Sequence, residues 1–240
     1  MSNNGKKEFV SGIKDSVPIA LGYLSVSFGF GIMAVSSGLT LFRAVLISMT
    51  CLTSAGQVAG LTVITTGGTL LEMAIAQFII NLRYSLMSIS LSQKLDGSFG
   101  LKDRLISSFG MTDEIFAVAS GRSREVSKHY LYGLIVMPYI AWALGTLLGA
   151  AAGEILPDML KAALGIAIYG MFTAIFVPAA RKAVGVLAVV LLAAGLSCVI
   201  KYVPLFKGVS SGFSIIICTV AAALFGALVF PAKKEEESAQ

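Results

Sequence analysis

The chain has 240 residues, of which 56% are hydrophobic and only 13% are charged. Soluble domains carry about 25% charged residues, so the composition argues against a soluble protein. The net charge of +5 does not indicate nucleic-acid binding, because the basic residues lie at the ends of apolar runs, where they orient membrane segments. Several uncharged runs reach the roughly 20 residues that cross a bilayer. We therefore predict an all-α, polytopic membrane protein with about seven hydrophobic segments (six to eight), some broken or re-entrant.

The first segment divides the N-terminal region into a tail and a membrane span. Residues 1–16 are predicted to be a cytoplasmic, partly helical tail, and the first span runs over 17–36, with Pro18 near its start. Residues 17–230 are treated as a single transmembrane transporter domain. Residues 231–240 are predicted to be a cytoplasmic C-terminal tail. The apolar run after residue 16 is too long for a cleavable signal peptide.

The second segment, 41–66, carries an unusual patch of small and polar residues in its middle. The patch consists of Thr50, Thr53, Ser54, Gly56, Gln57 and Gly60. Such a patch is typical of a helix that breaks at membrane depth, where transporters build binding sites from exposed backbone. The alternative is an unbroken helix whose small residues allow close packing.

The third segment, 69–92, is polar on two sides of a membrane helix. At 100° per residue one stripe holds Gln77, Asn81, Tyr84, Ser85 and Ser88, and the opposite side holds Glu72, Arg83 and Met87. Polar groups inside a membrane usually face a partner or a cavity. Either these residues join helices together, or one stripe lines a substrate path. The sequence does not select the stripe.

The fourth segment, 105–120, is short and has Thr112-Asp113-Glu114 at its centre. It is either a short crossing or a re-entrant or interfacial element. Asp113 and Glu114 point about 100° apart on a helix, so they do not form a dyad that shares one proton. One of them is expected to pair with Arg83 while the other meets solvent or substrate. A purely structural ion pair is the alternative.

The remaining segments are 130–153, 162–177, 184–200 and 209–230. In the first of these Gly145, Gly149 and Gly153 recur every four residues, which predicts a close helix contact. Lysine and arginine place the 121–129 loop and both termini inside. Eight crossings fit if 105–120 spans. Six fit if 41–66 is a re-entrant hairpin and 105–120 stays on the inner side.

Several enzyme and metal signatures are absent or incomplete. The G-x-S-x-G pattern at 208–212 lacks a strand–turn–helix context and a histidine partner, because His129 is the only histidine and is predicted on the other side. The three cysteines, Cys51, Cys198 and Cys218, are scattered through apolar segments. We therefore expect no catalytic residues, no metal and no cofactor.

Taken together, several short motifs resemble a known family. They are the opening 18–23 (PIALGY), the patch 54–57 (SAGQ), Asn81-Leu82-Arg83 with Leu86-Met87, and Thr112-Asp113-Glu114. In this order and spacing they are similar to the AzlC family, the large subunits of two-component branched-chain amino-acid exporters. The resemblance extends from about residue 9 to 230. It implies export of valine, leucine or isoleucine across the bacterial cytoplasmic membrane, with methionine as a further substrate, and a small hydrophobic partner subunit of the AzlD type. Proton-driven exchange is the usual expectation for such carriers.

A zwitterionic aliphatic amino acid requires a cation, an anion and an apolar pocket. We expect Arg83 to bind its carboxylate and Asp113 or Glu114 to hold its ammonium group and exchange a proton. The complete set of predicted substrate-binding residues is Gly56, Gln57, Asn81, Arg83, Asp113 and Glu114. Alternatively, Arg83 and Asp113 pair with each other and the substrate lies on the 77–85 stripe. An importer or channel for another solute and a non-transporting membrane scaffold are the competing functions.

Overall fold

A computed structural model describes residues 3–157, 159, 170, 173, 177–206 and 208–230. The predicted tail at 231–240 and most of the predicted span at 162–177 lie outside these residues. The described chain is helical and divides into two compact units. Unit 1 comprises residues 1–61 and 80–169, and unit 2 comprises 62–79 and 170–240.

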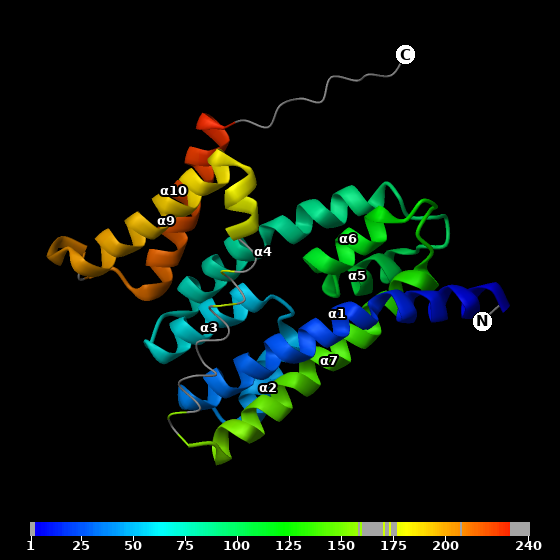
Figure 1. The fold of residues 1–240 in the computed structure, drawn as a ribbon, viewed down its shortest axis with the longest axis horizontal. Helices are drawn as coiled ribbons and strands as arrows, with labels where there is room; N and C mark the ends of the chain where they lie inside the picture. The colour runs from blue at the N-terminus through cyan, green and yellow to red at the C-terminus, as the bar shows by residue number, and fades with distance from the viewer. Residues whose placement is uncertain are drawn as a thin grey trace. The chain divides into compact units, whose positions relative to one another are not determined.

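The helices follow one another as Figure 1 shows. Their bounds are α1 (Asn3–Ser36), α2 (Leu41–Thr50), α3 (Ser54–Thr65), α4 (Leu70–Ser92), α5 (Leu101–Phe109), α6 (Asp113–Gly121), α7 (Lys128–Ile155), α9 (Val184–Tyr202) and α10 (Ser211–Val229), with a 3₁₀ turn at Pro204–Phe206. In the described residues five of these, α1, α4, α7, α9 and α10, are long and apolar enough to cross a membrane. The prediction of a helical membrane protein is confirmed.

Helix α1 is longer than the predicted first span. It begins at Asn3 rather than near residue 17, so the N-terminal tail continues the membrane helix, and Pro18 lies inside it. The tail was predicted to be only partly helical, because charged residues such as Lys6, Lys7 and Lys14 separate it from the apolar run.

Unit 1 is built on α1 and α7, which run parallel in close contact. The predicted glycine face of α7 makes this contact: a Cβ added to Gly149 would lie 2.0 Å from Phe28 O, and one added to Gly145 would lie 2.5 Å from Leu24 O. Conversely, a Cβ on Gly31 of α1 would lie 2.3 Å from Thr146 O. Side chains at these positions would push the backbones apart, so the glycine spacing sets the helix separation.

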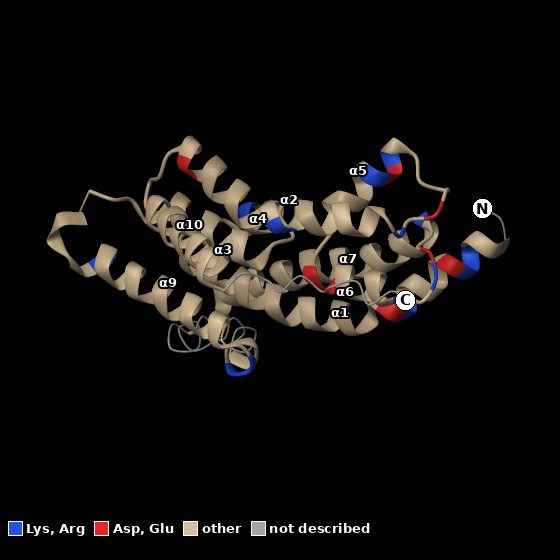
Figure 2. Ribbon diagram, turned by 90° about the horizontal axis from the view of Figure 1, so that it is seen from above, with Lys and Arg blue, Asp and Glu red and all other residues tan. Residues whose placement is uncertain are grey.

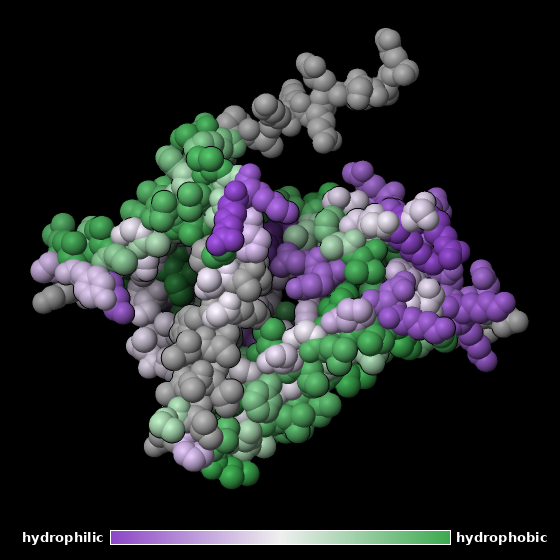
Figure 3. Space-filling view, in the orientation of Figure 1, coloured by the Kyte–Doolittle hydropathy of each residue, from purple (hydrophilic) through white to green (hydrophobic). Residues whose placement is uncertain are grey.

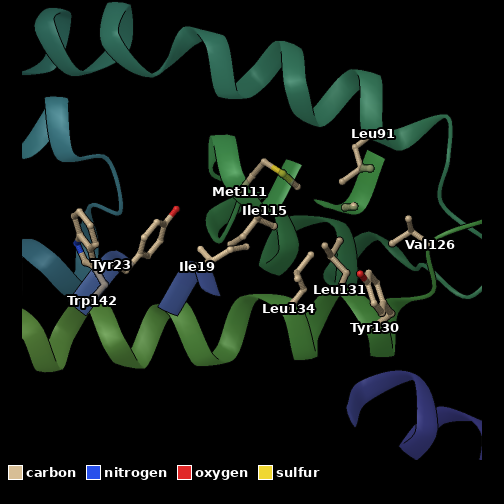
Figure 4. Close-up of a cluster of buried hydrophobic side chains, with 11 residues drawn as sticks. Ile19, Tyr23, Leu91, Met111, Ile115, Val126, Tyr130, Leu131, Leu134 and Trp142 are labelled. Atoms are coloured by element: carbon tan, nitrogen blue, oxygen red, sulfur yellow. The ribbon is translucent and has the colours of Figure 1, made fainter. Parts of the chain in front are cut away.

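A buried cluster extends from this pair toward the shorter helices. Figure 4 shows Tyr23 beside Trp142. It also shows Tyr130, Leu131 and Leu134 along α7, with Met111 and Ile115 on the same side. The Tyr23 and Trp142 rings pack edge to face with centroids 5.0 Å apart. This cluster fixes α6 against both long helices.

Two chain segments turn back on themselves inside unit 1. Gln57 Nε2 of α3 donates to Ser48 Oγ of α2 at 2.9 Å, although nine residues would separate them by about 13 Å along an unbroken helix. Leu95 and Val126 form a β-bridge, so the segment between them, which contains α5 and α6, begins and ends at the same point of unit 1. Both geometries match the six-crossing alternative, in which 41–66 is a re-entrant hairpin and 105–120 returns to its starting side.

Charged and hydrophobic residues lie in different parts of unit 1. In Figure 2 lysine and arginine gather where α1 begins and around α5, while the rest of α1 and α7 is almost free of charge. Figure 3 shows hydrophobic residues over α1 and α7 and hydrophilic ones near the N-terminus. This distribution suits a unit that crosses a bilayer with its basic end inside.

In unit 2 helices α9 and α10 pack together, and Glu72 is anchored at the N-terminus of α10. Glu72 is only 2% exposed and its carboxylate accepts hydrogen bonds from the Ser210 hydroxyl and from Phe213 N. A Cβ on Gly212 would lie 2.2 Å from Glu72 Oε1. Ser210, the central serine of the G-x-S-x-G pattern, is therefore the N-cap of α10 and a partner of Glu72.

Candidate functional site

The first helix break lies between α2 and α3, where the sequence predicted it. Helix α2 ends at Thr50, the backbone at Cys51 is extended (φ −137°, ψ 107°), and α3 begins at Ser54. Glycine, serine and threonine favour this interruption because they tolerate the close backbone contacts of a break. The Thr53 hydroxyl at the break donates to Asn81 Oδ1 of α4. The predicted stripe residue Asn81 thus meets the first break directly.

A buried series of hydrogen bonds connects this break to α2 and α7. Gln57, 1% exposed, donates from Nε2 to Ser48 Oγ (2.9 Å) and to Cys51 O (2.8 Å). Ser48 Oγ in turn lies 2.6 Å from Thr146 Oγ1 of α7. The remaining polar atom, Gln57 Oε1, is buried without a hydrogen-bond partner among the described residues. An unsatisfied buried acceptor is costly and suits an incoming N–H donor.

The second helix break, residues 110–112, separates α5 from α6. The Thr112 side chain caps α6 through Ile115 N, and the two predicted acids, Asp113 and Glu114, occupy the first turn of that helix. Negative charge is stabilised at a helix N-terminus by the free N–H groups and the macrodipole. The sequence predicted one segment here; the structure has two short helices, and the break positions both acids.

Arg83 and Asp113 form an ion pair, with Nη2 2.8 Å from Oδ2. Their side chains are 50% and 39% exposed, so the pair is open to the surroundings of the unit. An ion pair this exposed contributes only about 0–1 kcal/mol to stability in water. Such a pair holds the helices weakly and is readily reached by a charged ligand.

Tyr84 connects the two breaks. Its hydroxyl accepts a hydrogen bond from Arg83 Nη2 at 2.9 Å and lies next to the side chains of Thr53 and Asp113. A continuous polar network therefore runs from Asn81 through Thr53, Tyr84 and Arg83 to Asp113. We call these five residues the two-break network.

Glu114 points to α1 instead of Arg83. The Tyr23 hydroxyl lies 2.6 Å from both Glu114 Oε2 and Thr112 Oγ1. Because the Tyr23 ring is packed against Trp142, its hydroxyl is held at a fixed position beside the second break. The two neighbouring acids therefore have different partners: Asp113 pairs with Arg83, whereas Glu114 meets Tyr23 and not the solvent or substrate expected for the second acid.

The two stripes of α4 thus contact different breaks. Asn81 meets α3 at the first break, whereas Arg83 meets α6 at the second. Glu72, on the Arg83 side in sequence, is not part of this network and anchors α10 in unit 2. Gly56 is buried near the start of α3. Sequence reasoning omitted Thr53, Tyr84, Tyr23 and Thr112 from the site, although all four lie in the motifs or stripes it singled out.

The chemistry of the network suits the recognition of charged groups. Among the described residues no group of three or more His, Cys, Asp or Glu side chains is placed to hold a metal ion. The network instead offers a guanidinium, a carboxylate, two hydroxyls and an amide at membrane depth. Discontinuous helices around such groups are a construction that secondary transporters share.

These features define a helical, multi-pass membrane protein with a transporter-like site. Comparison with known proteins identifies its family: the AzlC protein family profile matches residues 18–156, more than half of the chain, and the chain belongs to this family. The matched range contains both helix breaks and the whole two-break network. No solved structure matches the chain.

Three relatives support the assignment. An uncharacterized membrane protein of Archaeoglobus fulgidus is 34% identical over 172 residues, which cover 71% of this chain and 75% of the relative. The inner membrane protein YgaZ of Escherichia coli K12 is 27% identical over 175 residues, covering 70% and 71%. An uncharacterized membrane protein of Helicobacter pylori is 26% identical over 155 residues, covering 61% and 67%.

Proposed function

We propose that this chain is the large subunit of a secondary transporter that exports branched-chain amino acids: valine, leucine and isoleucine, with methionine as a further candidate. Membership of the AzlC family supports the transporter class. The observation that carries the proposal is the open ion pair between Arg83, in the middle of the continuous helix α4, and Asp113, at the start of α6 directly after the second break.

A zwitterionic amino acid complements this pair. Its carboxylate replaces Asp113 at the Arg83 guanidinium, which binds carboxylates with two parallel N–H groups. Its ammonium group replaces Arg83 at Asp113. Opening one ion pair and forming two therefore conserves charge pairing at membrane depth, where an unpaired charge is expensive. The buried acceptor Gln57 Oε1 provides a further partner for an N–H group.

The aliphatic side chain of the substrate requires an apolar wall. Each break has an apolar residue next to its polar ones: Leu52 at the first break and Met111 at the second, both in or against the buried cluster of unit 1. Methionine adapts to ligands of different shape because it is unbranched and polarizable. A wall of this kind accepts valine, leucine and isoleucine with small differences in affinity.

Coupling to protons is assigned to the acids at the start of α6. Asp113 and Glu114 sit beside hydroxyl groups, Tyr84 and Tyr23 respectively, that can pass a proton along the network. Protonation of Asp113 removes the anion that holds the substrate ammonium. Proton entry through this residue would then favour substrate release on the outer side.

A small hydrophobic partner subunit of the AzlD type completes the transporter in this proposal. Helix α9 has no buried residue among those described, although it is among the most apolar helices of the chain. A membrane partner or lipid must cover such a surface. A test is to express the chain with and without the partner and compare the sedimentation of the detergent-extracted complex.

The transport activity is tested in cells that contain both subunits and are loaded with a valine-containing dipeptide. The proposal expects valine to leave these cells several-fold faster than cells without the two subunits. Equal efflux rates would reject amino-acid export and favour a membrane scaffold. Net uptake of valine, or equal movement of unrelated solutes, would favour an importer or a channel.

A further inference from the structure

A cavity lies in unit 1, between the C-terminal half of α4, helix α5 and α7. It is partly open and has a volume of about 230 Å³. Its wall combines an apolar part with one basic and several hydroxyl side chains: Ile89, Leu91, Leu95, Met111 and Leu131, with Arg104, Ser88, Ser92, Ser107 and Ser108. Drug-sized ligands occupy about 300–1,000 Å³, so this cavity suits a smaller molecule.

Two polar groups of the cavity are unused. Ser107 is 4% exposed, and its Oγ is buried without a hydrogen-bond partner within the described part of the chain. The guanidinium of Arg104, one helical turn earlier on α5, has no hydrogen bond or ion pair to any described residue. A buried hydroxyl that lacks a partner in a polar cavity indicates a missing ligand group.

The position of α5 is fixed, so these groups are held at the cavity. Asp103, the neighbour of Arg104, accepts hydrogen bonds from Tyr132 at 2.7 Å and Gly100 N at 2.9 Å, and its carboxylate lies 3.5 Å from Lys128 Nζ. The carboxylate of Asp103 is therefore already bound to side chains of α7 and to the backbone at the start of α5. Arg104 is left to face another anion.

The cavity lies at the basic end of unit 1. The Leu95–Val126 bridge closes the segment that contains α5 and joins it to the 121–129 loop, where Arg122 and Arg124 reside. The excess of lysine and arginine places this end in the cytoplasm. A ligand in the cavity would thus come from the side on which an exporter collects its substrate.

We propose that this cavity is a cytoplasmic loading site for the exported amino acid, separate from the two-break network, in which Arg104 and Ser107 bind the carboxylate and the apolar wall holds the aliphatic side chain. The inference rests on the proposed export function. The ammonium group remains at the open side of the cavity, in water.

The observations favour a small carboxylate over an anionic lipid headgroup. A single guanidinium lines the cavity, whereas anionic lipid surfaces are attracted by clusters of four to eight lysines and arginines. Half of the lining residues are apolar, which a phosphate group does not require. A ligand with a branched aliphatic side chain next to one carboxylate matches both the apolar part of the wall and the part that contains Arg104.

The test uses everted membrane vesicles that contain both subunits, in which export appears as uptake from the outside medium. Labelled leucine uptake is measured over a range of concentrations for the wild type, Arg104→Gln and Lys102→Gln. The control removes the same charge from the same helix but at a position outside the cavity. Ser107→Leu, which fills the cavity and keeps the charge, is the second variant. Inhibition by 4-methylpentanoate, which has the carboxylate and side chain of leucine without its ammonium group, is measured in parallel.

The loading site predicts that Arg104→Gln and Ser107→Leu raise the KM for leucine about tenfold with little change in maximal rate, while Lys102→Gln resembles the wild type. It also predicts that 4-methylpentanoate inhibits the wild type competitively and that Arg104→Gln abolishes this inhibition. An unchanged KM in both cavity variants would overturn the loading site alone. The loading site would also be overturned if the uptake rate of the wild type depended on the anionic lipid content of the vesicles and that of Arg104→Gln did not. Absence of leucine uptake by the wild type would overturn the export function as well.

Discussion

Arg83 in the middle of α4 and Asp113 at the first position of α6 form a 2.8 Å ion pair across a break in the membrane helices. The two residues are 30 positions apart in sequence, and α5 and the second break lie in the chain between them. The pair is half-exposed, which leaves it accessible to a zwitterion.

The ion pair predicts how variants that replace either charged residue by an uncharged one behave. Arg83→Gln and Asp113→Asn should each abolish valine efflux while the protein still reaches the membrane, because each removes one of the two charges that bind the substrate. The double variant restores charge balance within the protein. If the pair serves only to join α4 and α6, the double variant should recover activity; we expect it to remain inactive. Efflux from dipeptide-loaded cells, with immunoblots of the membrane fraction, distinguishes these results.

Tyr23 offers a test of the second acid. Tyr23→Phe keeps the ring against Trp142 but removes the hydroxyl that contacts Glu114 and Thr112. A hydrogen bond to a charged group contributes about 1.5–3 kcal/mol, so the export rate should fall by about tenfold or more. Tyr139→Phe, which removes a hydroxyl that donates to Met49 O, is the matched control. Equal rates in both variants would show that Glu114 does not depend on Tyr23.

The contact between α1 and α7 predicts opposite effects for two glycine substitutions. Gly149→Ala should destabilise the protein by about 1–3 kcal/mol, because its Cβ would lie 2.0 Å from Phe28 O. Gly22→Ala on α1 has no atom within 4 Å of the added Cβ and should be neutral or slightly stabilising, since alanine favours helix. The temperature at which each variant loses its monodisperse peak in size-exclusion chromatography measures the difference. A Gly149→Ala protein as stable as the wild type would contradict the parallel helix contact.

Asp103 predicts a pH dependence of the attachment of α5. The Tyr132 hydroxyl, the Gly100 N–H group and Lys128 stabilise the ionised carboxyl and hold the pKa of Asp103 below its ordinary value. A lowered folded-state pKa gives stability that is present above the unfolded value of about 3.9 and lost as pH falls through the folded value. Asp103→Asn should therefore lower the melting temperature at pH 7 and differ less and less from the wild type below about pH 4.

Glu125→Gln is the control for this measurement, because Glu125 is an exposed acid in the neighbouring loop. It should melt with the wild type across the whole pH range. A difference between Asp103→Asn and the wild type that stays constant down to pH 2 would show that the Asp103 charge does not hold α5.

The sequence was sufficient for the membrane class, the family and most helix positions, because apolar length and glycine spacing are local properties. The fold in Figure 1 and the contacts between its helices show what the sequence could not provide. The tail at 1–16 was predicted to be partly helical, but its continuity with the first span was missed because its first turns are polar. The split of 105–120 into α5 and α6 was missed because Gly110 and Thr112 interrupt the helix without an unusual composition.

Contacts between residues distant in sequence were harder still. The pairing of Arg83 with Asp113 was among the stated alternatives, since few opposite charges are available at membrane depth. The use of Glu72 as an anchor for α10 was not foreseen, because its partner Ser210 lies 138 residues away. Tyr84 was placed on a polar stripe, but only the fold shows that it joins the two breaks.

Counterflow in proteoliposomes is the most direct test of the central claim, that the two-break network binds a branched-chain amino acid. Liposomes containing the purified two-subunit protein are preloaded with unlabelled leucine, and entry of labelled valine is followed. The account predicts rapid exchange among valine, leucine and isoleucine by the wild type, none by Asp113→Asn, and none with glutamate or lysine as the internal solute. Undiminished exchange by Asp113→Asn, or no exchange by the wild type, would contradict it.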